Sequence, residues 1–279
     1  MDESNYTRHE INSLEQLISF KDPADLKWIF RGEDSDRPFQ TTFERACRQW
    51  TDISNTKEIE NKLIYEFQRR AHLYVPNPPP AVDDTMEWLA LMQHYGAPTR
   101  LLDWTYSLFI ATFFALEKVK DEKKVKDEAI VWAINTDWID LEPKKIIRAS
   151  IGEKWLKEWV DKRTGKAFDK VFRKHNALFV HRTNPHILNQ RLSTQQGLFL
   201  CPGSISKSFE DNILALPNSQ KNIYKICIPL RIREELILRL HRMNINAESL
   251  FPGLDGFARS LWTRLPILSR INIKYRKLT

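Results

Sequence analysis

The sequence concentrates polar side chains that can perform chemistry in three short segments. The first is WIFRGE at residues 28–33, in which Arg31 follows an apolar run and Gly32 follows the arginine. A guanidinium at the end of a strand can hold a phosphate or a carboxylate through two hydrogen bonds, and a glycine permits the close approach of another group. Arg31 and Gly32 are therefore candidate ligand-binding residues. A structural ion pair made by Arg31 is the alternative.

The second segment, QHYGAPTRLLDWT at residues 93–105, is the densest. It places an imidazole, a phenol, a guanidinium and a carboxylate between two apolar helices, on a turn stiffened by glycine and proline. Arg100 and Asp103 are close enough in sequence to pair, which either prepares Arg100 for an anionic ligand or locks the loop. His94 can act as an acid or base near neutral pH or cap the preceding helix. The candidate residues here are His94 and Asp103 for catalysis and Tyr95, Thr99, Arg100 and Trp104 for ligand binding.

The third segment is NQRLSTQQGLF at residues 189–199. Neutral amides beside an arginine offer hydrogen bonds without a strong base, which suits recognition of an amide, a ribose hydroxyl or a nucleobase edge. Arg191 is a candidate ligand-binding residue, and Gln195 and Gln196 are candidates for the reaction itself. A capped turn that leads into a strand is the structural alternative.

The elements that must position these segments follow from hydrophobic spacing. Apolar residues at helical spacing predict helices over residues 11–19, 42–50, 57–74, 85–94, 107–120, 153–162, 232–243 and 255–265. Runs of branched and aromatic residues predict strands over residues 27–31, 129–135, 198–200 and 223–230. Because helices and strands alternate irregularly and no repeat is visible, we expect an α+β fold, a single domain with a small mixed or antiparallel sheet surrounded by many helices.

Composition excludes several classes of protein. Apolar residues make up 42% of the chain and aromatic residues 11%, which is a globular composition. The patterns GxxxxGK[ST], GxGxxG, HExxH and GxSxG are absent, which argues against the phosphate-binding loops and weakens a zincin or α/β-hydrolase reading. The 3 cysteines form no CxxC, so we expect no disulfide framework, no metal and a reducing cytoplasmic location.

Charge and hydropathy indicate which classes of partner the protein is expected to bind. The formal net charge of +7 favours partners that carry phosphates. The N-terminus is polar, and the longest apolar run, residues 108–116, is too short to cross a bilayer, so no membrane partner is expected.

Several of these motifs together resemble the FRG domain family, which is named for its Phe-Arg-Gly motif. They are FRG at 30–32, QHYGAPTRLLDWT at 93–105, FFAL at 113–116, RLSTQQGLF at 191–199 and SLFPGLDGFARSL at 249–261. The resemblance divides the chain into an N-terminal helical extension (1–25), an FRG domain (26–265) and a C-terminal basic tail (266–279). It implies a bacterial or phage-encoded module, some of whose relatives occur in settings of anti-phage defence or toxicity.

The same motifs resemble, more distantly, the site of ADP-ribosyltransferases, where an early-strand arginine grips NAD, a central Ser, Thr or Tyr element supports the nicotinamide, and a later Glu or Gln motif completes the site. Arg31 corresponds to the first element and Gln195 or Gln196 to the third, and Arg31 and Arg100 would neutralise the diphosphate. RLSTQQGLF lacks the usual catalytic glutamate, so Glu33 or Asp103 would have to replace it.

These observations favour a nucleotide-directed enzyme that uses NAD as a substrate, by transfer or hydrolysis of ADP-ribose, in phage defence or toxicity. Its partners would be a small-molecule nucleotide and a protein or nucleic-acid acceptor. Two alternatives stay open. One is a nucleic-acid-directed enzyme or binding module, suggested by the positive charge and by the stretch EFQRRAHLY at residues 66–74. The other is a non-enzymatic ligand-recognition domain.

Overall fold

The structure is a computed structural model that describes residues 1–20, 27–50, 55–75, 79–118 and 128–269. Residues 270–279 of the predicted basic tail lie outside these ranges. Within them, seven strands form one mixed sheet, which confirms the α+β fold and is larger than the small sheet expected.

The sheet has the order β1-β7-β4-β2-β3-β6-β5, and all neighbours are antiparallel except the parallel pair β1 and β7. The strands are β1 (Thr7–Glu10), β2 (Trp28–Glu33), β3 (Leu102–Thr105), β4 (Glu128–Asn135), β5 (Val180–Thr183), β6 (Gly197–Pro202) and β7 (Ile223–Pro229). Neighbours in the sheet are often distant in sequence, so residues far apart along the chain meet on adjacent strands.

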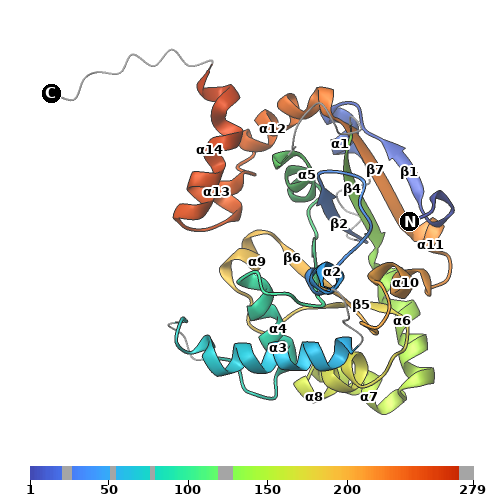
Figure 1. The fold of residues 1–279 in the computed structure, drawn as a ribbon. Coiled ribbons are helices and arrows are strands. Elements are labelled where there is room, and N and C mark those ends of the chain that lie inside the picture. Colours follow the sequence, from blue (N-terminus) through green and yellow to red (C-terminus); the bar gives the residue numbers. More distant parts are fainter. Residues whose placement is uncertain (21–26, 51–54, 76–78, 119–127, 270–279) are drawn as a thin grey trace.

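Helices pack around this sheet (Figure 1). Those in the first half of the chain are α1 (Leu14–Ser19), α2 (Thr42–Gln49), α3 (Thr56–Ala71), α4 (Thr85–His94), α5 (Leu108–Glu117) and α6 (Thr136–Ser150). The later ones are α7 (Glu153–Lys157), α8 (Gly165–Phe168), α9 (Gln190–Thr194), α10 (Phe209–Leu214), α11 (Ser219–Asn222), α12 (Arg233–Arg242), α13 (Ala247–Leu250) and α14 (Leu254–Leu268). Two π-helical turns, η2 (Glu158–Lys162) and η3 (Asp169–Arg173), and the 3-10 turns η1 (Glu3–Asn5) and η4 (Leu230–Ile232) complete the described elements.

The sheet is buried on both faces, as β4 illustrates. Alternate residues of a strand point to opposite faces. Ile130 and Trp132 join one apolar cluster, with side chains of α4, α6 and α8, whereas Val131 and Ala133 join another, with side chains of α1, α5 and α12. This explains why β4 reads as a nearly continuous apolar run rather than an alternating one.

Three strands escaped prediction. β3 and β5 are each only four residues long, and β3 lies inside the polar segment that the sequence interpreted as a turn. β1 lies in the N-terminal segment, which was expected to be helical but contributes a strand as well as helix α1. The predicted helix over 153–162 forms as α7 followed directly by the π-helical turn η2.

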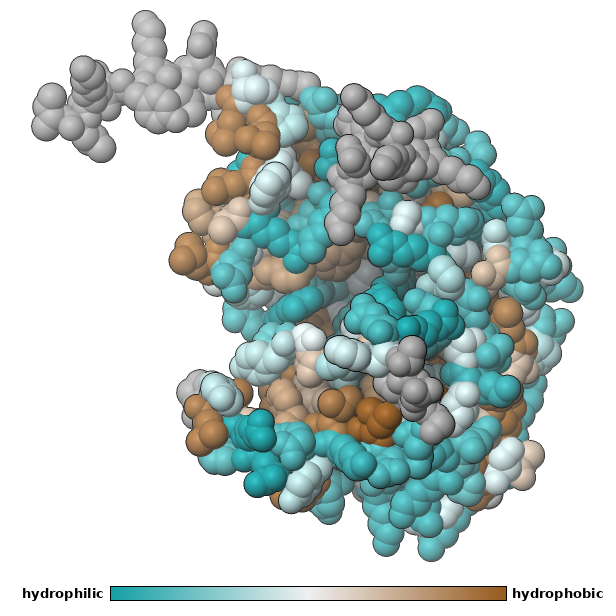
Figure 2. Space-filling view, viewed as in Figure 1, coloured by the Kyte–Doolittle hydropathy of each residue, from teal (hydrophilic) through white to brown (hydrophobic). Residues whose placement is uncertain are grey.

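Helices α13 and α14 extend from the sheet beside α12 (Figure 1). α14 continues three residues into the predicted basic tail, to Leu268. Apolar side chains gather over it at the upper left of Figure 2, and Leu254, Trp262 and Leu265 are among its exposed residues. The segment between and including these two helices forms one wall of the candidate site.

Candidate functional site

Adjacent strands bring the three polar segments of the sequence together. In the sheet, Phe30 of β2 pairs with Thr105 of β3, and Thr105 pairs with Gly197 of β6. Arg31 follows Phe30 directly, and Gln195 precedes Gly197 by two residues. The Thr105 hydroxyl also donates a hydrogen bond to the carbonyl oxygen of Gln195 (2.7 Å), which fixes the turn before β6 against β3.

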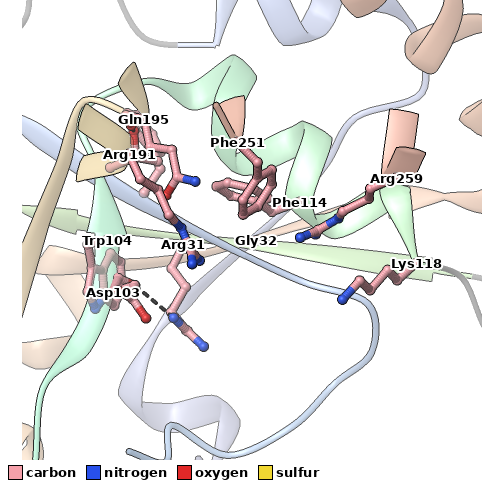
Figure 3. A pocket seen from close by; sticks show the side chains of 12 residues that line it. Arg31, Gly32, Asp103, Trp104, Phe114, Lys118, Arg191, Gln195, Phe251 and Arg259 are labelled. Atoms are coloured by element: carbon pink, nitrogen blue, oxygen red, sulfur yellow. Dashed lines mark hydrogen bonds between the residues drawn. The ribbon is translucent and has the colours of Figure 1, made fainter. Parts of the chain in front are cut away.

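A pocket of about 250 Å³ lies where these segments meet (Figure 3). Six of the residues predicted from the sequence line it: Arg31, Gly32, Asp103, Trp104, Arg191 and Gln195. The other lining residues are Phe30, Thr105, Phe114, Lys118, Phe251 and Arg259. Strands β2 and β3, helix α9 and the α13–α14 region thus contribute to one cavity.

The lining carries a strong excess of positive charge. Its cations are Arg31, Lys118, Arg191 and Arg259, and its carboxylate is Asp103. Arg259 makes a two-pronged ion pair with Glu117 at the end of α5. Among the described residues, no carboxylate lies within ion-pair distance of Arg191 or Lys118. These two cations are therefore available to an anionic guest.

Phe251 holds two of the cations in place. The guanidinium carbon of Arg191 lies 4.7 Å from the centre of the Phe251 ring, and that of Arg259 lies 4.0 Å from it. Figure 3 shows the two arginines on either side of the ring. The attraction between a guanidinium and an aromatic ring orients both side chains without neutralising either charge. Burial lowers the pKa of Arg191, and the charge of Arg259 adds to this effect while Asp103 opposes it.

Asp103 is oriented by its neighbours although its side chain is exposed. The Gln93 amide donates a hydrogen bond to its carboxylate (2.7 Å), and the buried Thr99 hydroxyl donates in turn to the Gln93 carbonyl oxygen. Arg31 donates to the main-chain carbonyl oxygen of Asp103 (2.7 Å) rather than to its carboxylate. The carboxylate therefore stays free to face a ligand.

Arg31 and Gly32 have structural as well as site roles. Arg31 forms an ion pair with Glu33 at 2.6 Å, and Glu33 is not part of the pocket lining. A Cβ atom on Gly32 would lie 1.9 Å from the carbonyl oxygen of Ala111. The glycine is therefore required because α5 packs directly on the backbone of β2, whatever a ligand needs.

His94 lies in a smaller recess that shares Asp103, Arg191 and Gln195 with the main pocket. Its Nδ1 is buried and has no hydrogen-bond partner among the described residues. Burial lowers the pKa of His94, and the nearby charge of Arg191 lowers it further. Both effects favour the neutral form of the imidazole.

The comparison with protein families bears on these residues. The family model of the FRG domain matches residues 26–124, a range that includes both the FRG motif and the PTRLLDWT core. The chain contains an FRG domain. No curated protein and no solved structure matches the chain. The matched range covers Arg31 and Asp103, whereas the other side of the pocket, with Arg191, Gln195 and Phe251, comes from the chain that follows it.

One arginine of the FRG domain core does not reach the site. Arg100 is fully buried and makes a two-pronged ion pair with Glu60 of α3, with Nε to Oε1 at 2.6 Å. It also donates to the carbonyl oxygen of Phe172 (2.5 Å). The expectations that Arg100 pairs with Asp103 and that it neutralises a diphosphate are both wrong, because Glu60, forty residues earlier, occupies the guanidinium.

Of four other predicted residues, three lie outside the pocket lining and the fourth, Trp104, lies in it. Tyr95 is 58% exposed at the end of α4 and is not in the pocket lining. Gln196 is exposed in a left-handed conformation, and its carbonyl oxygen accepts a hydrogen bond from the Tyr106 amide. Thr99 acts through Gln93, as described above. Trp104 lines the pocket, but its ring is buried against Phe39, at 5.7 Å between ring centres.

The structure adds residues that the sequence interpretation did not select: Gln93, Phe114, Lys118, Phe251 and Arg259. Two of them, Phe251 and Arg259, lie in SLFPGLDGFARSL, from which no site residue was selected. Its presence among the motifs of the family resemblance was the signal that could have identified them.

Three further observations concern the basic stretch, metal-binding groups and helix length. Arg69 and Arg70, in the basic stretch over residues 66–74, both pair with Glu66, at 3.5 and 2.9 Å. In the described ranges, no group of three His, Cys, Asp or Glu side chains is arranged to hold a metal ion. No helix among those residues has the length and apolar character needed to cross a membrane.

Proposed function

We propose that the pocket binds NAD or a related nucleotide and that the protein transfers or hydrolyses its ADP-ribose. The observation that carries the proposal is the convergence of four cations on a cavity whose carboxylate, Asp103, is exposed and oriented. Two of these cations lack carboxylate partners among the described residues. Such a cavity favours a ligand with more than one negative charge, as in a diphosphate.

The size of the pocket indicates which part of the nucleotide it holds. Its volume of about 250 Å³ is slightly below the range of about 300–1,000 Å³ typical of small-molecule sites. Asp103 and Lys118 are exposed at its mouth. The pocket would therefore take the nicotinamide ribose and the adjoining phosphates, with the adenosine half extending outside.

The resemblance to the site of ADP-ribosyltransferases suggests a role for one residue on each of three segments that line the pocket. Arg31 on β2 is the early-strand arginine, and Gln195 before β6 is the later-strand residue. Thr105 on β3 is the candidate for the Ser, Thr or Tyr of the middle element, since it lines the pocket. Its hydroxyl also holds the Gln195 turn.

Asp103 takes the place of the missing glutamate. Positive charge develops at the anomeric carbon of the ribose as the bond to nicotinamide breaks, and a nearby carboxylate stabilises that charge. Glu33 is engaged with Arg31 and lies outside the pocket lining, so Asp103 is the better of the two candidates named from the sequence.

The experiment separates binding from reaction. Calorimetry with ADP-ribose measures binding, and chromatographic detection of nicotinamide released from NAD measures the reaction. Asp103→Asn should keep ADP-ribose binding and lower nicotinamide release at least about 100-fold. Arg148→Ala, which removes an exposed arginine that is not part of the pocket lining, should change neither.

Each failure has a distinct meaning. ADP-ribose binding without nicotinamide release would overturn the reaction and leave a recognition domain. Absence of both, together with salt-sensitive binding of oligonucleotides, would replace the proposal with a nucleic-acid function. If the protein acts in toxicity or phage defence, its expression should lower cellular NAD and arrest growth, and Asp103→Asn should relieve both effects.

A further inference from the structure

Helix α14 exposes its large apolar side chains and buries small residues instead. On a helix that packs against its own protein, the large apolar side chains normally face the core and the opposite face is polar. The buried residues of α14 are Gly256, Ser260 and Thr263. A Cβ atom on Gly256 would lie 1.7 Å from the carbonyl oxygen of Phe251, so this face packs closely on the turn before the helix. The reversed pattern is expected of a helix whose apolar face packs against another molecule.

The exposed apolar side chains form one continuous stripe along α14. It consists of Leu254, Phe257, Leu261, Trp262, Leu265 and Leu268. At about 100° per residue, these six positions fall within a sector of roughly 140° of the helix surface. No charged residue lies in that sector. The helix is at the edge of the molecule, where another molecule can approach the stripe (Figures 1 and 2).

The area of the stripe is large enough for a stable interface. Leu254 and Trp262 are 79% and 77% exposed, and the other four are exposed by at least 41%. If a fully exposed side chain of this size presents roughly 180 Å², the six together expose about 600 Å². Two copies joined through the stripe would therefore remove up to about 1,200 Å² of apolar surface from water, above the roughly 1,000 Å² expected of a specific interface.

The spacing of the stripe is symmetric about Leu261. Leu254 and Leu268 each lie seven residues from it, on opposite sides. Phe257 and Leu265 each lie four residues from it. A two-fold axis makes both copies present the same surface to each other. In an antiparallel pair of α14 helices with the axis at Leu261, Leu254 of one copy therefore meets Leu268 of the other. Phe257 of one copy meets Leu265 of the other in the same way.

We propose that α14 pairs with α14 of a second copy in antiparallel orientation, so that the protein forms a two-fold symmetric dimer. Apolar residues at alternating spacings of three and four are the pattern by which one helix packs along another. None of the six stripe residues lines the candidate pocket, so the pairing does not depend on the NAD proposal.

A lipid surface is the other partner that an apolar helix face can meet, and the charges of α14 do not favour it. Helices that lie on membranes carry cations that are available to anionic lipids on their polar face. Arg259 forms an ion pair with Glu117, and Arg264 forms one with Glu248. Both arginines of the described helix are therefore already neutralised by carboxylates of the protein.

Analytical ultracentrifugation of the full chain tests the dimer. At about 100 µM, above the micromolar to picomolar dissociation constants of standard-size interfaces, the unaltered protein should have the mass of two chains. Leu261→Glu places two carboxylates against each other at the axis and should give the mass of one chain. Leu261 is exposed in the single chain, so the variant should keep the circular dichroism spectrum of the unaltered protein. Leu141→Glu makes the same change at an exposed leucine of α6 and should leave the dimer intact.

Cysteine crosslinking tests the antiparallel orientation. In Leu261→Cys the two introduced thiols meet at the axis, so mild oxidation should link two chains through a disulfide. In Leu254→Cys the two thiols would lie about 21 Å apart along the helices, at 1.5 Å per residue, and should not link. The unaltered chain, with its three free cysteines, is the control and should also stay unlinked.

Four results would overturn the proposal. A single-chain mass for the unaltered protein at about 100 µM would show that the stripe does not pair. Sedimentation of that single chain with vesicles of phosphatidylserine and phosphatidylcholine, abolished in Leu261→Glu, would assign the stripe to a lipid surface. A two-chain mass in Leu261→Glu would place the dimer interface elsewhere. A disulfide in Leu254→Cys as well as in Leu261→Cys would replace the antiparallel pair with a parallel one.

Discussion

Arg100 and Arg191 lie in two regions of the molecule, and their guanidinium groups have opposite environments. Arg100 is buried, and its guanidinium donates hydrogen bonds to the Glu60 carboxylate of α3 and to a main-chain carbonyl oxygen. Arg191 lies at a cavity, held by the ring of Phe251 and without a carboxylate partner among the described residues. An arginine in a conspicuous motif is therefore no sign of a ligand until the carboxylates around it are known.

The largest loss of unfolding free energy that tests this contrast is expected from removal of the buried Arg100. Arg100→Ala leaves the buried Glu60 carboxylate with Arg173 alone, whose Nε lies 3.5 Å from Oε2. Breaking a buried ion pair by removing one partner costs about 3–5 kcal/mol of unfolding free energy. Denaturant unfolding measures the loss. Arg148→Ala, which breaks an exposed ion pair with Glu153, should cost no more than about 1 kcal/mol. Equal losses in the two variants would remove the distinction between a scaffold arginine and a surface one.

His181 is a buried histidine outside the lining of the candidate pocket, and it gives a test that depends on pH. Burial lowers the pKa of His181 to about 4, while Asp140 faces the ring with an opposing influence and Lys144 and Arg182 reinforce the shift. Between about pH 6.5 and 4 the unfolded state binds the extra proton, so this contribution to stability is complete above pH 6.5 and is lost on acidification.

The loss attributed to His181 should reach roughly 3 kcal/mol at pH 4. Unfolding free energies measured at pH 7 and pH 4.5 should therefore differ less in His181→Gln than in the unaltered chain. His72→Gln, at an exposed position, is the control and should keep the full difference. The same pH dependence in both variants would show that His181 is not the group responsible.

Much of the site could be predicted because its residues lie in distinctive local patterns. Helix α4 forms over the predicted 85–94, and Arg31, Asp103, Arg191 and Gln195 meet as their polar clusters suggested. These successes rest on short-range signals: a cap, a glycine stop and polar residues between apolar elements.

What could not be predicted depends on pairing between distant parts of the chain. The ion-pair partner of Arg100 is Glu60 on α3, and no residue close to Arg100 in sequence predicts this pairing. β3 has four residues, of which Asp103 is exposed, and this is too short a pattern to predict a strand. It is a strand because it pairs with β2 and β6 on either side. The contribution of Phe251 and Arg259 likewise follows only from where α13 and α14 pack.

Gly32 offers a further test, because it lies at the pocket but is explained by packing. A Cβ added there would meet the backbone of α5, with the carbonyl oxygen of Ala111 at 1.9 Å and the amide nitrogen of Ala115 at 2.6 Å. Gly32→Ala should therefore lower the unfolding free energy by about 1–3 kcal/mol. In Gly197→Ala the closest atom, at 2.5 Å, is a side-chain methyl of Leu192, which can move aside, so a smaller loss is expected. The reverse order would show that β2 and α5 can separate at little cost.

Replacement of Arg191 is expected to change stability the least and to change ligand binding as well. Arg191→Ala removes a guanidinium–ring contact worth about 0.5–1 kcal/mol and no ion pair among the described residues, so denaturant unfolding should move little. If the proposed nucleotide site is correct, calorimetry should show ADP-ribose affinity falling about tenfold, because one of the two cations without a carboxylate is lost. Arg191→Lys keeps the charge but loses the planar group that stacks on Phe251, and should restore only part of the affinity. A variant that loses stability as Arg100→Ala does, with ADP-ribose affinity unchanged, would make Arg191 a second scaffold arginine and abolish the contrast between the two regions.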